Sequence, residues 1–211
     1  MPVADDRGPA PQAQSGNLGG NLVMLMKWWR QPTRDSTIEA IYGVIVAQAR
    51  EPLFYAQYKV PDTVEGRFDM LVLHLFLYLR RLSGPGFQDG VGQPLFDRFC
   101  SDLDGNLREM GIGDISVPKR MQKFGRAFYG RSTAYAKALA AGDRAAGAVA
   151  LARNVFGLET PTQGVFLLTD YMFEAAQALQ EADDGQLERG QFTFPVPRPL
   201  AATEAASDDA H

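Results

Sequence analysis

Hydrophobic residues recur at helical spacing along most of this chain, and the pattern predicts helices from residue 36 onward. Ser36 with Glu39 three residues later is a capping box, a signature of a helix N-terminus. Pro52 should end this first helix, because proline cannot continue a helical backbone. Its apolar stripe follows the i, i+3, i+4, i+7 rule and consists of Ile38, Ile41, Tyr42, Ile45 and Ala49.

A second helix is predicted from Asp62, followed three residues on by Glu65, to about Leu82. Between Met70 and Leu79 it is apolar almost all round, which is typical of a helix buried at the centre of a bundle. This run is also too short to cross a bilayer, which takes roughly 20 apolar residues. We therefore expect a central core helix.

Four more helices are predicted downstream, and no alternating run long enough for a sheet follows them, apart from a short one at residues 191–194. The fold class expected is all-α, a single compact bundle of about six helices with disordered tails. The predicted domain plan is a disordered segment at 1–20, a helical domain at 21–190 and a C-terminal tail at 191–211. The four further helices are expected at about 94–110, 116–139, 143–156 and 162–182.

Charge is distributed unevenly. The chain of 211 residues has a net charge of −4, yet residues 115–142 contain no Asp or Glu. The cations of this stretch fall opposite the apolar face of the predicted helix, and like charges there repel unless an anionic partner relieves them. The sequence predicts a binding face for an acidic protein loop, ribosomal RNA or an anionic lipid surface, the alternative being a solvated helix side. The cations include Lys119, Arg120, Lys123, Arg126, Arg131 and Lys137.

The N-terminal part carries a second hint of a surface role. Trp28 and Trp29 stand between Lys27 and Arg30, a composition favoured at the membrane–water interface. The alternative is a short helix packed on the body of the protein. The first residues lack an apolar signal core and include acids, which favours a cytoplasmic protein. Peripheral attachment to the inner membrane through the two tryptophans is a further hypothesis.

Residues that support catalysis are scarce. His74 lies in the apolar helix and is interpreted as a core histidine, and the lone Cys100 as a small buried hydrophobe. Zinc sites and His-dependent triads therefore lack partners. We expect no enzyme activity, no cofactor, and no catalytic or metal-binding residue. The alternative is a cation held by Asp97, Asp102 and Asp104, against which Arg98 and Arg108 stand at ion-pair spacing from Asp102 and Asp104.

Three blocks in order along the chain resemble the ubiquinol–cytochrome c chaperone family: YGVIVAQAREPLFYAQYKVPD, DTVEGRFDMLVLHLFLYLRRLSG and NLREMGIGDISVPKRMQKFGRAFYGR. The resemblance extends over about residues 42–157. It implies an all-helical, non-enzymatic factor for assembly of ubiquinol–cytochrome c reductase, a respiratory-chain complex. The implied client is newly made cytochrome b, bound at the membrane surface. A ribosome or an anionic membrane are further expected partners, and DNA is not.

The resemblance also indicates partner-binding residues by position. Arg80 and Arg81 form a second basic cluster, for which stabilisation of a helix C-terminus is the alternative role. Gly111 and Gly113 have an alternative role as a helix stop. The remaining functions considered are a membrane-surface or lipid-binding adaptor and a metal-dependent helical enzyme. The predicted partner-binding set is Arg80, Arg81, Glu109, Gly111, Gly113, Asp114, Lys119, Arg120, Lys123, Arg126, Tyr129 and Arg131, with Trp28 and Trp29 as membrane contacts.

Overall fold

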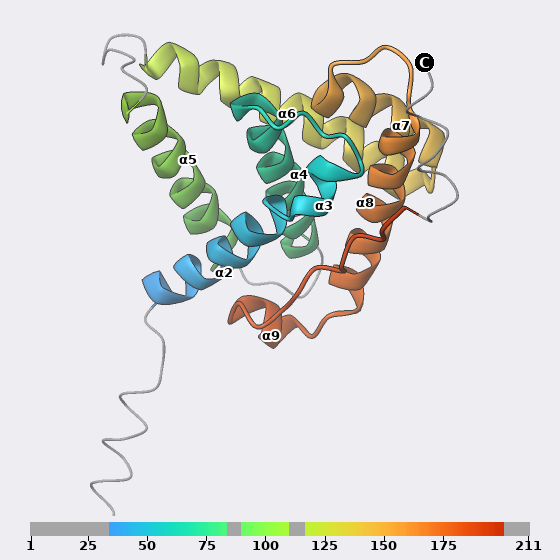
Figure 1. Cartoon of the computed structure of the whole chain (residues 1–211). Coiled ribbons are helices and arrows are strands. Elements are labelled where there is room, and N and C mark those ends of the chain that lie inside the picture. Colours follow the sequence, from blue (N-terminus) through green and yellow to red (C-terminus); the bar gives the residue numbers. More distant parts are fainter. Residues whose placement is uncertain (1–33, 84–89, 110–116, 201–211) are drawn as a thin grey trace, which may run out of the picture. The chain divides into compact units, whose positions relative to one another are not determined.

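The computed structural model describes residues 34–83, 90–109 and 117–200 (Figure 1). Within these ranges there is no β-strand, and the predicted all-α class is confirmed. Six of the helices described have eight residues or more, as the periodicity indicated. In chain order the elements are α2 (Arg34–Ala49), α3 (Pro52–Ala56), α4 (Val64–Leu82), α5 (Gly92–Glu109), α6 (Val117–Ala141), α7 (Arg144–Leu151), a π-helical turn (Ala152–Phe156), α8 (Gln163–Glu181) and α9 (Asp184–Glu188).

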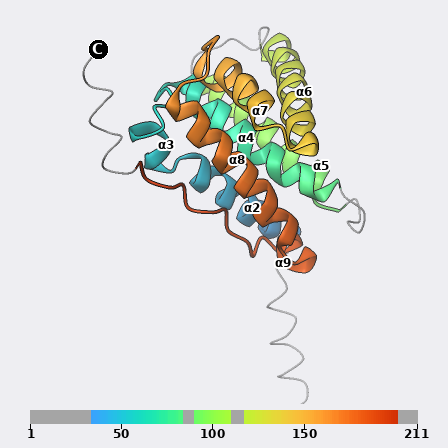
Figure 2. The same ribbon diagram turned by 90° about the vertical axis from the view of Figure 1, so that its right-hand side faces the viewer.

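Helix α4 is the centre of the bundle, as its sequence predicted. It packs against α2, α6, α8 and the π-helical turn, and the other helices surround it in both views (Figures 1 and 2). Every residue from Asp69 to Tyr78 is buried except Leu71, which is half-buried. Each fully buried leucine or phenylalanine here contributes about 1.5–3 kcal/mol relative to an exposed one. The helix thus supplies much of the hydrophobic core.

Two predicted helix starts are wrong in detail. Helix α2 begins at Arg34, so Ser36 lies in its first turn, together with Asp35, whose negative charge suits a helix N-terminus. Helix α4 is capped by Thr63 and not by Asp62: the Thr63 hydroxyl accepts from the backbone N–H of Gly66 at 3.1 Å. The Asp62 carboxylate instead accepts from the Arg67 guanidinium at 2.6 Å, a charge-assisted bond.

The segment from residue 191 to residue 200 contributes to the core. It is extended, with no partner strand among the described residues, and Phe192 and Phe194 are buried while Thr193 between them is exposed. Side chains from elsewhere take up its polar groups: Gln48 Nε2 donates to the Pro195 carbonyl at 3.2 Å, and the Tyr58 hydroxyl donates to the Arg198 carbonyl at 3.0 Å. Figure 2 shows this segment passing across α2 toward α3. Residues 191–200, which the sequence assigned to the C-terminal tail, are therefore packed on the helices. Residues 1–33 and 201–211 lie outside the described residues.

Candidate binding surface on helix α6

Helix α6 carries the basic stretch singled out in the sequence. Its C-terminal half is anchored by Tyr135 and Ala138, each 1% exposed. Its N-terminal half rests on Met121, Phe124 and Phe128, which are only half-buried. The helix contacts α4, α5 and α7 and lies at the edge of the bundle (Figure 2). One side of α6 is therefore left to solvent over most of its length.

That solvent side presents the predicted cations. Lys119, Lys123, Arg126 and Lys137 are exposed, and none of them has an acidic partner among the described residues. Spacings of four and three residues bring Lys119, Lys123 and Arg126 onto one face of the helix. Tyr129 lies beside them and is 77% exposed, so its ring does not contribute to the core. We call Lys119, Lys123, Arg126 and Tyr129 the basic face.

Arg131, predicted to bind a partner, points inward instead. Its Nη1 lies 2.7 Å from Oδ1 of Asp69 on α4, and the two side chains are 20% and 11% exposed. Burial raises the pKa of Asp69 to about 7, while the Arg131 charge lowers it. The pair joins α6 to the central helix, so we leave Arg131 out of the proposed surface.

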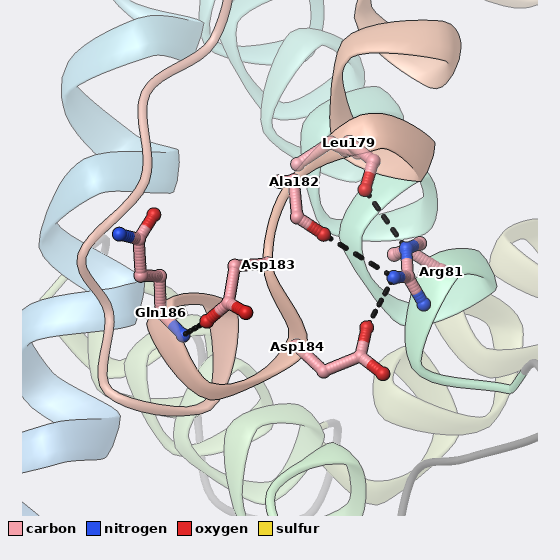
Figure 3. A network of polar contacts seen from close by, with 6 residues as sticks. All are labelled: Arg81, Leu179, Ala182, Asp183, Asp184 and Gln186. Atoms are coloured by element: carbon pink, nitrogen blue, oxygen red, sulfur yellow. Dashed lines mark hydrogen bonds and ion pairs between the residues drawn. The ribbon is translucent and has the colours of Figure 1, made fainter.

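Arg81 is also used within the fold (Figure 3). Its Nε donates to the Leu179 carbonyl at 2.8 Å, and its Nη2 donates to the Ala182 carbonyl at 3.4 Å and pairs with Asp184. These carbonyls end α8, so the guanidinium satisfies acceptors that a helix C-terminus leaves open. Arg81 therefore stabilises a helix C-terminus, the structural role considered for it, but the helix is α8 and not α4, to which Arg81 itself belongs. Its neighbour Arg80 is half-buried and has no ion pair among the described residues.

Several predicted site residues lie where the structure gives no description. Gly111, Gly113 and Asp114, in the connection before α6, are outside the described residues, as are Trp28 and Trp29. Arg120 belongs to α6, but its side chain is not described. Glu109 is exposed at the last position of α5.

Of the three aspartates of the alternative metal site, Asp102 and Asp104 are in the surface ion pairs that their spacing indicated, and Asp97 is hydrogen-bonded to a neutral side chain. Asp102 accepts from the Tyr42 hydroxyl at 2.9 Å and lies 3.5 Å from Arg98 Nη1. Asp104 pairs with Arg108 at 2.7 Å. Asp97 accepts from the Gln93 side-chain amide at 2.7 Å. In the described part of the chain no group of three or more His, Cys, Asp or Glu side chains is placed to hold a metal ion.

His74 is the core histidine that the sequence indicated. Its Nδ1–H donates to the Met70 carbonyl at 2.7 Å, which leaves Nε2 to accept from the Tyr171 hydroxyl at 2.8 Å. Burial lowers the pKa of His74 to about 4, so the ring is neutral at physiological pH. Cys100 is half-buried, and burial raises the pKa of its thiol. Neither group is presented as a nucleophile or base.

Sequence reasoning did not identify Asp69 as the ion-pair partner of Arg131. It directly precedes the apolar run of α4, and an acid at the edge of such a run needs a cation to offset its desolvation. That position in the sequence was the available signal, but the partner is 62 residues away and only the fold identifies it as Arg131.

Among the described helices, none is both long and apolar enough to traverse a lipid bilayer.

Comparison with known proteins gives a consistent result. Protein CBP3, mitochondrial, of Saccharomyces cerevisiae is 29% identical over 150 residues, which are 68% of this chain and 44% of the yeast protein. This chain thus matches less than half the length of that relative. The crystal structure of the Cbp3 homolog from Brucella abortus superposes with a TM-score of 0.72 at 40% identity, over 83% of this chain and 97% of the other.

The family match covers α4 to α9 and the first four residues of the extended C-terminal segment. Residues 56–194 match the family described as ubiquinol-cytochrome C chaperone, which includes the whole basic face. That description is of a chaperone and not of an enzyme, in agreement with the sequence-based expectation. The chain belongs to the ubiquinol–cytochrome c chaperone family.

Proposed function

We propose that this protein holds newly made cytochrome b during assembly of ubiquinol–cytochrome c reductase, and that the basic face of α6 contacts the client. The observation that carries the proposal is the row of exposed cations Lys119, Lys123 and Arg126, without acidic partners in the described structure, inside the part of the chain that matches the family. The resemblance supplies the client, and the charges supply the chemistry of the contact.

A preformed helix suits this task. Because Tyr135, Ala138 and the Arg131–Asp69 pair fix α6 to the bundle, its outward side chains bind without first ordering a loop. Exposed cations steer an anionic segment toward the helix and release it again at modest cost, since rim charges change association rates more than affinity. Such reversible contact suits a protein that must hand its client on to an assembling complex.

Contact with a membrane surface is the second function considered, and Tyr129 is the observation that favours it. An exposed tyrosine beside lysines and an arginine matches the composition of membrane-interface sites, where each cation near an anionic surface contributes about 1 kcal/mol. In this version α6 docks on anionic lipid, or on the ribosome, and the client is met there.

The first test is in vivo. Membranes from cells that lack the protein, with and without re-expression, are compared by reduced-minus-oxidised difference spectroscopy. We expect a selective loss of the haem b signal of the reductase, restored by the wild-type chain. An unchanged signal in cells that make the reductase would reject the assembly function.

The second test addresses the basic face. We expect Lys119→Gln/Lys123→Gln/Arg126→Gln to lower the yield of co-purified cytochrome b and to reduce restoration of haem b. The matched control, Lys59→Gln/Arg153→Gln/Arg189→Gln, removes the same charge from exposed positions on other elements. Equal loss in both variants would show that net charge and not the α6 surface matters. Vesicles with phosphatidylglycerol distinguish the lipid version: salt-sensitive binding lost in the first variant, with normal haem b, would favour the adaptor.

A further inference from the structure

An open pocket lies where the end of α2, helix α3 and the start of α4 meet. Its volume is about 400 Å³. None of its lining residues belongs to α6, so it is separate from the basic face. The lining consists of Arg50, Pro52, Tyr55, Ala56, Asp62 and Arg67.

One side of the pocket is built by Arg67. Its Nε donates to Asp62 Oδ1 at 2.6 Å, and its guanidinium carbon lies 5.7 Å from the centre of the Tyr55 ring. The hydrogen bond from Arg67 lowers the pKa of Asp62, so this carboxyl is ionised at neutral pH. The Nη groups of Arg67 make no hydrogen bond within the described structure and remain available as donors.

Arg50 supplies the second cation. Its side chain is exposed and makes no ion pair with the described residues, although it lies close enough to Tyr55 to oppose the rise in the pKa of that hydroxyl caused by burial. Two arginines and one aspartate leave the lining with a net positive charge of one. The lining therefore favours an anion.

The remaining walls are apolar. The Tyr55 hydroxyl donates to the Ala49 carbonyl at 2.6 Å, so its hydrogen is occupied and the ring forms a wall beside Pro52 and Ala56. Such walls suit an anion that carries an aliphatic part, because they cover carbon atoms while the guanidinium groups bind the charge.

We propose that this pocket binds the carboxylate of an aspartate or glutamate side chain from an acidic segment of a partner protein. Arg50 and Arg67 bind the carboxylate, and Tyr55 and Pro52 contact the methylene groups behind it. The second oxygen of Asp62 accepts a backbone N–H of the peptide. The proposal concerns a contact in addition to that of α6 and does not depend on the identity of the client.

The test is an NMR titration of the ¹⁵N-labelled chain with the peptide acetyl-Leu-Glu-Leu-Gly-amide and its Gln counterpart. We expect the Glu peptide to shift the amide signals of Tyr55, Ala56 and Arg67, and to bind roughly tenfold more tightly than the Gln peptide, as loss of a charge-assisted bond implies. Equal binding of both peptides would overturn the proposal. Inorganic phosphate and phosphatidylglycerol vesicles are the competing probes, and stronger arginine-dependent shifts with either of them would also overturn it.

Two variants localise the effect. Arg50→Gln/Arg67→Gln should weaken the Glu peptide by roughly tenfold, while Lys137→Gln/Arg153→Gln, which removes the same charge from exposed positions elsewhere, should leave it unchanged. Because Arg50 and Arg67 are exposed, the first variant should fold, and its spectrum away from the pocket verifies this. Equal weakening in both variants would show a general charge effect and would reject the pocket.

The chain itself contains carboxylates that could occupy the pocket in place of the peptide, and the experiment must distinguish the two. Leu200, the last residue described, donates its backbone N–H to the Gln57 side chain, next to pocket residue Ala56. Beyond it the sequence contains Glu204, Asp208 and Asp209. In a variant with these three changed to amides, unchanged peptide binding supports the proposal. Clearly tighter binding would show that the tail competes for the pocket in the wild-type chain, and would overturn the assignment to a partner protein.

Discussion

Two aromatic clusters in the described part of the chain hold their helices in different ways. The inner cluster is fully buried and contains tyrosines and a histidine whose polar atoms are bonded. The outer cluster consists of phenylalanines from α4, α5 and α6, most of them only half-buried. The inner cluster is Phe54, Tyr58, His74, Tyr78, Tyr171, Phe192 and Phe194, and the outer cluster is Phe68, Phe96, Phe99, Phe124 and Phe128.

The polar atoms account for the difference. In the inner cluster the Tyr58 and Tyr78 hydroxyls donate to the Arg198 and Leu187 carbonyls, and that of Tyr171 to His74. A buried donor left without its acceptor costs about 1–3 kcal/mol, so each bond favours one arrangement of the chain. The outer cluster has only ring contacts, which tolerate small shifts. The fold is thus specified most strongly at α4 and α8, and less strongly where α6 carries the basic face.

The largest expected effect is a comparison of Phe54→Ala with Phe128→Ala. Phe54 is fully buried, and its ring centre lies 4.8 Å from that of Tyr171, so its removal should lower the free energy of unfolding by about 3–5 kcal/mol. Phe128 is half-buried, so Phe128→Ala should lower the free energy of unfolding by only about 1–2 kcal/mol, because less buried apolar area is lost. Urea unfolding followed by circular dichroism measures both. Equal losses would remove the distinction between the clusters.

A pair of glycines tests the same contrast through the backbone. A Cβ on Gly164 would lie 1.9 Å from the Tyr58 carbonyl oxygen, so Gly164→Ala should destabilise the protein by up to about 3 kcal/mol. On α6 a Cβ on Gly130 meets nothing within 4 Å, and Gly130→Ala should stabilise the protein by about 0.5–1 kcal/mol. Thermal unfolding gives the sign of each change, and destabilisation by Gly130→Ala would contradict the open packing around α6.

The Arg131–Asp69 pair joins the two regions and should respond to pH. Because the pKa of Asp69 is raised in the folded state, to about 7, its contribution to stability falls as the pH rises from about 4 to about 7. Arg131→Gln should therefore cost little at pH 5, where the carboxyl is protonated, and about 1–2 kcal/mol at pH 8, where a buried carboxylate loses its cation. Unfolding curves at both pH values test this, and an equal cost at the two would show that Asp69 stays ionised throughout.

The smallest effect on stability is expected at Tyr129. Since its side chain is 77% exposed, Tyr129→Ala should change the free energy of unfolding by less than about 0.5 kcal/mol. We expect it nevertheless to reduce co-purification of cytochrome b. A large loss of stability would instead assign Tyr129 to the fold and remove it from the proposed surface.

The sequence was most informative where helices are long and periodic. All five apolar positions predicted for the first helix are buried, and Asp143 caps α7 where the fifth helix was expected. The short helices α3 and α9 were missed, because five residues are too few for periodicity to show. The role of residues 191–200 was missed as well, since prolines break any regular pattern there and its partners lie far away in sequence, on α2, on α4 and just after α3.

The candidate site was predictable only in part. Absence of acids over residues 115–142 identified the basic face, because the charge pattern of an amphipathic helix is local information. The inward turn of Arg131 and the contacts of Arg81 with α8 depend on partners 62 and about 100 residues away. The same residue type at similar helical spacing thus acts in the core or at the surface according to tertiary contacts.

The extended C-terminal segment has a consequence for when the protein folds during its synthesis. Phe192 and Phe194 complete the inner aromatic cluster, whose other members lie between residues 54 and 171, and the bond from Gln48 to Pro195 closes a loop of 147 residues. Contacts of such long sequence separation form late, because the chain must first lose the entropy of the open loop. During synthesis the helices accumulate around an incomplete core until residues 192–195 leave the ribosome. The chaperone should therefore reach its stable form only after this segment has been made and has docked on the helices.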